Sequence, residues 1–218
     1  MKNTFPSSTS IMDFRLHCNR TMCVVGPSHS GKTTFVLNLL EHRKEMFNCE
    51  TNRVVWCYGI YQHKLHQQLQ QRGYVLHPNI VSIEDVQPYD IIVLDDLLHE
   101  SKNSQEVTAM FTKAAHHKPC FIIFIMQNLF PPGKEARTRS LNTHYLVLFK
   151  NPRDKSQVEF LARQVKPRNP KALIEVFETA TEKPHSYLFL DLTQECPDAY
   201  RLRSSLFEKP MILYRMTT

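Results

Sequence analysis

Residues 22–40 of the chain, MCVVGPSHSGKTTFVLNLL, contain the motif that decides the fold. Within them, residues 26–33 match the pattern G-x-x-x-x-G-K-[S/T], between an apolar run typical of a strand and a run typical of a helix. We expect Gly26 and Gly31 to adopt backbone angles that a side chain would forbid, so that successive N–H groups face one anion. The sequence therefore predicts a phosphate-binding loop, and residues 26–33 are called the phosphate loop below.

The residue types in this loop suit a nucleoside triphosphate and its magnesium ion. Lys32 places a positive charge near the β- and γ-phosphates, the Thr33 hydroxyl can hold Mg²⁺, and the helix N-terminus adds its dipole. The alternative is a glycine turn beside a solvated lysine, but both flanks fit nucleotide binding. The residues expected to hold ATP are Gly26, Pro27, Ser28, His29, Ser30, Gly31, Lys32, Thr33 and Thr34.

The composition is that of an ordinary globular protein. With 218 residues, of which 42% are hydrophobic, the chain is long enough for one domain with a sizeable core. No apolar run approaches the roughly 20 residues of a membrane span, and the N-terminus has no apolar segment of the kind found in secretory signals. We expect one domain over residues 1–218, with a core at about 12–192, a C-terminal extension at about 193–218, and no membrane association.

The cysteines show no disulfide or metal-binding pattern. The six cysteines are scattered without a C-x-x-C pair, and Cys57 and Cys120 lie inside apolar runs, as buried thiols often do. We therefore expect free thiols in a reducing, intracellular compartment.

Positive charge is concentrated in residues 134–171, called the basic segment below. The chain has a formal net charge of +6, and this segment holds ten basic residues against three acidic ones. Such a segment attracts phosphate-rich partners, although a solvated surface of the same composition is an equal alternative. Its basic residues are Lys134, Arg137, Arg139, Lys150, Arg153, Lys155, Arg163, Lys166, Arg168 and Lys171.

Strands and helices alternate along the chain, which predicts an α/β fold of three layers with a mainly parallel central sheet. Strands are expected at residues 14–16, 22–25, 54–58, 80–83, 91–94, 121–126, 145–149 and 187–190, the last closing the sheet. Helices are expected from Thr33 (burying Val36, Leu39, Leu40 and Phe47), over 61–69 and 107–115, after the capping pair Asp154/Gln157, and from Asn169-Pro170. Residues 201–214 fit no element.

Polar residues end two of the apolar strands. Asp95 and Asp96 follow the strand at 91–94, and Gln127 and Asn128 follow the next one. Ligands of open α/β sheets bind beyond the carboxyl ends of the strands, where the phosphate loop also lies. We expect Asp95 to reach Mg²⁺ with the loop threonine, Asp96 to orient or deprotonate the attacking water, and Gln127 or Asn128 to hydrogen-bond the water or γ-phosphate. A simple turn or helix cap is the alternative for the aspartate pair.

The order of these motifs resembles that of the additional-strand catalytic-carboxylate ATPases. A strand–helix unit at residues 54–71 and the strand expected at 80–83 separate the phosphate loop from the aspartate pair. Small nucleoside and nucleotide kinases usually lack such a second acid.

Further blocks make the chain resemble a narrower family. They are GPSHSGKTTFVLNLL (26–40), LDDL (94–97), MQNLF (126–130), SLN (140–142), FKNPRD (149–154) and LARQ (161–164). Together they resemble the DNA-packaging ATPases of Polinton (Maverick) and related small double-stranded DNA viruses. Those ATPases are similar to the poxvirus packaging ATPase and belong to the FtsK/HerA class of DNA-pumping motors. The resemblance extends over residues 14–207, and its QNLF and KNPRD blocks are the most particular.

The resemblance implies a ring-forming motor that uses ATP hydrolysis to move duplex DNA into a capsid. It further implies capsid or portal partners and a place in the host nucleus or a cytoplasmic viral factory, with transient presence at the virion vertex. In this class an arginine from the neighbouring subunit completes the active site, and the candidates here are Arg137, Arg139 and Arg153. The chain departs from the family's pattern at two positions, and either change could slow hydrolysis. Asp96 stands where glutamate is common, and His29 stands where a small residue is usual.

Two other functions stay open at this point. One is a nucleoside or nucleotide kinase whose basic residues form a phosphate lid, which would release ADP only with an acceptor. The other is a non-enzymatic nucleotide-binding remnant of a viral gene, which would not turn over ATP at all. The aspartate pair and Gln127 argue against the first, and the intact Lys32, Thr33 and Asp95 argue against the second.

Overall fold

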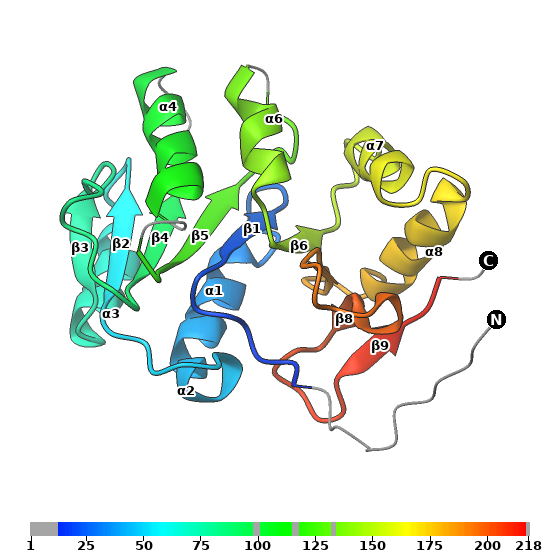
Figure 1. Cartoon of the computed structure of the whole chain (residues 1–218), viewed down its shortest axis with the longest axis horizontal. Helices are drawn as coiled ribbons and strands as arrows, with labels where there is room; N and C mark the ends of the chain where they lie inside the picture. The colour runs from blue at the N-terminus through cyan, green and yellow to red at the C-terminus, as the bar shows by residue number, and fades with distance from the viewer. Residues whose placement is uncertain (1–12, 98–100, 115–117, 132–133, 217–218) are drawn as a thin grey trace.

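The structure is a computed structural model that describes residues 13–97, 101–114, 118–131 and 134–216. Its strands form one sheet in the order β3-β2-β4-β5-β1-β6-β7-β8-β9 (Figure 1). β1 to β6 are parallel, whereas β7, β8 and β9 each run antiparallel to the preceding strand. The strands are β1 (Thr21–Val25), β2 (Val54–Tyr58), β3 (Val75–Pro78), β4 (Ile91–Asp95), β5 (Phe121–Met126), β6 (Tyr145–Phe149), β7 (Tyr187–Asp191), β8 (Leu202–Ser204) and β9 (Ile212–Tyr214).

Helices cover both faces of this sheet, which confirms the three-layer α/β fold. One hydrophobic cluster joins the sheet to α1 and α3, and a second joins it to α4, α7 and α8, on the other face (Figure 1). The helices are α1 (Lys32–Glu41), α2 (Arg43–Met46), α3 (His63–Gln71), α4 (Ser101–Ala109) with the π-helical turn η1 (Met110–Ala114), α6 (Lys134–Leu141), α7 (Ser156–Val165), α8 (Pro170–Ala180) and the 3₁₀ turn η2 (Asp198–Tyr200). None of these helices, within the described residues, has the length and apolarity that crossing a membrane requires.

The central strands explain why the sequence pattern was informative. All six residues of β5 are buried, as are all five of β1 and β6, because helices pack on both faces of a parallel sheet. Such strands are continuous apolar runs, which are visible in a sequence without any alternation. β5 lies between β1 and β4, so an additional strand separates the phosphate-loop strand from the aspartate strand.

Predictions at the margins of the sheet were wrong. Residues 80–83 form no strand. The edge strand β3 lies just before them, and Ile80 and Ile83 pack against the core from the irregular segment and turn that follow it. β3 was missed because its sequence, VLHP, is short, partly exposed and ends in proline. The strand expected at residues 14–16 is reduced to a single β-bridge between Leu16 and Phe47. Phe47 is buried, but it follows α2 and is not part of α1, where it was expected.

The sheet also continues past the strand that was expected to close it. β8 and β9 extend it, so residues 201–214 are part of the sheet. A buried ion pair holds β8 to β7: Arg203 donates to the Asp191 carboxylate at 2.8 Å. A buried arginine in a three-residue strand breaks the apolar pattern, which is why the sequence concealed this strand.

The cysteine prediction was wrong in one respect. Cys18 and Cys49 form a disulfide. The nearby β-bridge between Leu16 and Phe47 holds the two segments together, and the Cα atoms of the two cysteines are 6.2 Å apart. The other four cysteines are free and buried, as expected for Cys57 and Cys120. The inference of a reducing compartment assumed that all six cysteines are unpaired, and this disulfide contradicts that assumption.

Candidate functional site

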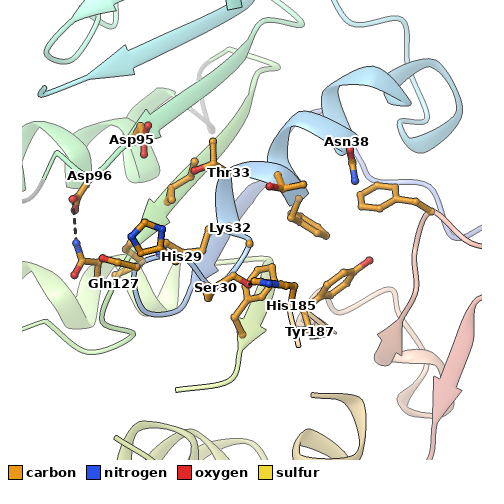
Figure 2. A pocket seen from close by; sticks show the side chains of 18 of the residues that line it. His29, Ser30, Lys32, Thr33, Asn38, Asp95, Asp96, Gln127, His185 and Tyr187 are labelled. Atoms are coloured by element: carbon orange, nitrogen blue, oxygen red, sulfur yellow. Dashed lines mark hydrogen bonds between the residues drawn. The ribbon is translucent and has the colours of Figure 1, made fainter. Parts of the chain in front are cut away.

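A cavity of about 1010 Å³ opens at the carboxyl ends of β1, β4 and β5, and it is called the strand-end cavity below. The phosphate loop and the first turns of α1 line one side, and the ends of β4 and β5 line another (Figure 2). The predicted side chains that line it are Ser28, His29, Ser30, Lys32, Thr33, Thr34, Asp95, Asp96 and Gln127. Parallel strands deliver their carboxyl ends to one edge, so residues far apart in sequence converge here.

The two glycines of the phosphate loop serve different purposes. Gly31 has a φ of 108°, in the left-handed region that glycine tolerates, as predicted. Gly26 has no positive φ, so the expectation of a forbidden backbone angle was wrong for this residue. Its requirement is space: a Cβ there would lie 2.7 Å from both Phe149 Cβ and Ser30 Oγ. The loop therefore packs directly against the end of β6.

Two features of the loop suit an anionic ligand. Lys32 Nζ donates to the carbonyl oxygens of Gly26 and Pro27, both at 2.7 Å, which holds the ammonium beside the loop. Burial lowers the pKa of Lys32, while the charges of Asp96 and Asp95 oppose that shift. The Ser30 hydroxyl oxygen is buried without a hydrogen-bond partner among the described residues. A phosphate group is able to satisfy both the cation and this hydroxyl.

The oxygen donors in the cavity fit Mg²⁺. Thr33 lies in the first turn of α1, and Asp95 ends β4; both line the strand-end cavity. Burial raises the pKa of Asp95, and the neighbouring Asp96 charge raises it further. A divalent cation favours the ionised carboxylate and relieves that cost, and hydroxyl and carboxylate oxygens are ligands that Mg²⁺ prefers.

The second acid and the polar end of β5 contact each other. Gln127 Nε2 donates to Asp96 Oδ2 at 3.2 Å (Figure 2). Asp96 has a φ of 51°, so the chain turns sharply just after β4 and presents this carboxylate toward β5. The Asn128 amide oxygen instead accepts from Gln157 Nε2, at 3.3 Å, and does not line the cavity. Of the two alternatives at the end of β5, the structure therefore brings Gln127 to the site.

The three candidate arginines lie in different surroundings. Arg139 is 4% exposed and donates to Thr108 Oγ1 at 3.1 Å, so its guanidinium lies inside the chain, between α6 and α4. Arg137 and Arg153 are exposed. Among the described residues that line the strand-end cavity, none is an arginine.

Several residues of the cavity carry no signal in the sequence. Its far side is lined by Asn38 on α1 and by His185, Tyr187, Ser205, Phe207 and Glu208 from the C-terminal third of the chain. His185 Nδ1 lies 3.3 Å from the Ser30 carbonyl oxygen, so this distant turn contacts the phosphate loop. No motif or spacing marks these residues, and those of the C-terminal third reach the site only because β7 pairs with β6 and β8 pairs with β7.

Comparison with models of protein families finds no match, and comparison with curated proteins finds none either. Among solved structures, the chain is similar to the genome packaging NTPase B204 from Sulfolobus turreted icosahedral virus 2, in complex with ATP-gammaS. The superposition has a TM-score of 0.47 and 12% sequence identity. It covers 82% of this chain and 95% of the other chain.

Proposed function

We propose that this chain is an ATPase that translocates double-stranded viral DNA into a preformed capsid, as the subunit of a homo-oligomeric ring. The observation that carries the proposal is the convergence of Lys32, Thr33, Asp95, Asp96 and Gln127 on one cavity, with an extra strand between β1 and β4. The packaging role itself rests on the sequence blocks that resemble viral packaging ATPases.

The chemistry follows from the placement of these side chains. Lys32 and the loop N–H groups bind the β- and γ-phosphates, and Thr33 and Asp95 hold the magnesium ion. Mg²⁺, when bound, neutralises charge on the phosphate oxygens. Asp96 accepts a proton from the attacking water or orients it, and the hydrogen bond from Gln127 fixes the carboxylate for that task. A carboxylate so held accepts a proton from water or from an acceptor hydroxyl, so the need for an acceptor in ADP release is what separates hydrolysis from transfer.

The cavity lacks one component that this reaction uses. The described lining contains no arginine, and a guanidinium that contacts the γ-phosphate in the transition state commonly accelerates hydrolysis by about 10³-fold or more. We propose that Arg137 or Arg153 of a neighbouring subunit supplies it, because both are exposed whereas Arg139 is buried within its own subunit. Hydrolysis would then occur at subunit interfaces.

The basic segment offers a surface for DNA phosphates. Its exposed members lie on and beside α6, α7 and α8, and directly after β6. Among them, Lys150 lines a groove that runs along the outer side of the phosphate loop. DNA bound there would lie close to the nucleotide. The capsid or portal partner and the location in the host nucleus or a viral factory belong to this proposal through the sequence resemblance alone.

ATP turnover with and without duplex DNA, together with the mass of the assembly, tests the proposal. We expect DNA to stimulate turnover by an assembly larger than the monomer. Release of ADP only with a nucleoside or nucleotide acceptor would show a kinase, and no turnover at saturating ATP, Mg²⁺ and DNA would show a binding protein.

Mixing variants tests the shared site. Lys32→Ala and the correct arginine variant, Arg137→Ala or Arg153→Ala, are each expected to be inactive alone and to recover hydrolysis when mixed, because each subunit supplies what the other lacks. Arg15→Ala, an exposed arginine outside the basic segment and the cavity, serves as the matched control with parental turnover. Failure of every mixture to recover activity would refute hydrolysis at a subunit interface.

A further inference from the structure

We propose that the far end of the strand-end cavity is a base-binding slot that selects adenine, formed by α1 and the turn at residues 205–208. This turn, called the C-terminal turn below, connects β8 to β9. The inference deepens the proposed function, since it rests on nucleotide binding at the phosphate loop and names the residues that select the base at the same site.

The C-terminal turn is held in place at the cavity. The Leu206 N–H donates to the Tyr187 hydroxyl oxygen at 3.0 Å, and the Glu208 N–H donates to the Ser205 carbonyl oxygen, also at 3.0 Å. Ser205 has a φ of 54°, which reverses the chain within two residues of β8. Because Tyr187 begins β7 beside β6, the turn is tied to the same strands that support the phosphate loop.

Aromatic side chains gather where the turn meets α1. The Phe207 ring lies 5.3 Å from the Phe35 ring and 5.8 Å from the His42 ring, and Tyr187 lies 4.8 Å from Phe35 on another side. Phe207, Tyr187 and Phe35 also line the strand-end cavity. Phe35 itself is buried, whereas Phe207 and Tyr187 are partly exposed, so these two rings offer a base a surface for stacking, an interaction open to every base.

The distance from the phosphate loop suits a base. Asn38 lies six residues after Lys32 on the same helix, which corresponds to about 9 Å along the axis. Figure 2 shows Asp96 and Gln127 at one end of the cavity and Asn38 and Tyr187 at the other end, with Lys32 and Thr33 between the two ends. A triphosphate bound at the loop therefore directs its nucleoside toward Asn38 and the C-terminal turn.

Two polar side chains at this end distinguish one base from another. The Asn38 amide offers a donor and an acceptor, the pair that matches adenine N7 and its N6 amino group. The Glu208 carboxylate is exposed at the rim of the cavity and accepts only, which suits an exocyclic amino group. Guanine presents two acceptors, N7 and O6, along the same edge, so one half of the Asn38 pairing is lost.

Binding measurements with two ligands separate the base slot from the phosphate site. The probes are ATPγS and inorganic tripolyphosphate, each with Mg²⁺, titrated into the full chain by calorimetry. Phe207→Ala is expected to weaken ATPγS binding about tenfold and to leave tripolyphosphate binding unchanged, because only the nucleotide loses a stacking partner. Phe207→Leu, which keeps more of the packing against Phe35, is expected to give the same selective loss. Phe160→Ala, an exposed phenylalanine on α7, is the matched control.

Base selectivity supplies the second arm of the experiment. The parent is expected to bind ATPγS more tightly than GTPγS, and Asn38→Ala is expected to reduce that ratio toward one. Two results would overturn the slot. One is equal affinity of the parent for tripolyphosphate and ATPγS, and the other is an equal loss of affinity for both ligands in Phe207→Leu. Equal affinity for ATPγS and GTPγS would overturn the assignment of adenine. Selective loss of ATPγS binding by a protein that does not hydrolyse ATP would support the slot and refute the motor.

Discussion

Replacing Gly26 with alanine tests whether the phosphate loop is positioned by contact with β6. The added methyl group would lie 2.7 Å from Phe149 Cβ and 2.7 Å from Ser30 Oγ, well inside normal van der Waals contact. Phe149 Cβ is fixed to the backbone of β6, so a rotamer change of Phe149 cannot relieve the overlap. The loop must therefore move away from β6, and overpacking of this kind costs about 1–3 kcal/mol.

The expected result of Gly26→Ala is a loss of both stability and nucleotide affinity. For a chain of this size, each kcal/mol corresponds to about 2–4 °C, so the melting temperature should fall by roughly 2–12 °C. The same movement displaces Ser30 and the Gly26 carbonyl that accepts from Lys32, so ATPγS binding should weaken about tenfold or more. Thermal unfolding and calorimetric titration of ATPγS measure the two effects.

Gly73→Ala is the matched control for this experiment. Gly73 has a φ of 75°, but no atom lies within 4 Å of the position that a Cβ would take. The variant should lose about 1–2 kcal/mol from the left-handed backbone alone and bind ATPγS like the parent, since it lies outside the cavity. If Gly26→Ala melts and binds like the parent, packing against β6 does not position the loop and the reasoning fails.

Four further outcomes are expected. Lys32→Ala should abolish hydrolysis while keeping the fold, as circular dichroism and an ATPase assay would show together; retained turnover would refute the phosphate-loop assignment. Asp96→Asn should still bind ATP with Mg²⁺ but hydrolyse it on the order of 10²-fold more slowly, and parental turnover would place water activation elsewhere. Asp95→Asn should weaken Mg²⁺-dependent binding yet raise the melting temperature at pH 7. The pKa of Asp95 is raised in the folded chain, so its ionised form opposes folding and removing that charge stabilises the fold. This gain in melting temperature should shrink as the pH falls toward 3.8, where Asp95 becomes protonated. Arg203→Ala should lower the free energy of unfolding by about 3–5 kcal/mol by leaving Asp191 buried without its cation, and a change below 1 kcal/mol in urea unfolding would contradict that role.

The sequence predicted the near side of the cavity because its residues are ordered locally. The phosphate loop is one continuous motif, Asp95 and Asp96 follow four buried aliphatic residues of β4, and Gln127 follows the wholly apolar strand β5. Parallel strands place their carboxyl ends at one edge, which predicts that the Asp96 and Gln127 side chains both lie there, and their contact arises because β4 and β5 are neighbours in the sheet.

The far side of the cavity could not be predicted in the same way. His185, Tyr187 and Phe207 reach it only because β7 pairs antiparallel with β6 and because β8 and β9 extend the sheet beyond it. Short edge strands with buried charge, such as β8, carry neither apolar continuity nor alternation. The disulfide between Cys18 and Cys49 was missed for a related reason, since it depends on a single bridge between residues 31 positions apart.

Gly26 shows where local motif and distant structure depend on each other. The motif alone suggests that both glycines provide unusual backbone angles, yet only Gly31 has a positive φ. Gly26 is required because the strand ending at Phe149, more than 120 residues away in sequence, occupies the space that a side chain would need. The same strand pairs with β7, whose first residue fixes the C-terminal turn. One strand therefore contacts the phosphate loop at Phe149 and, through its pairing with Tyr187, supports the C-terminal turn of the proposed base slot.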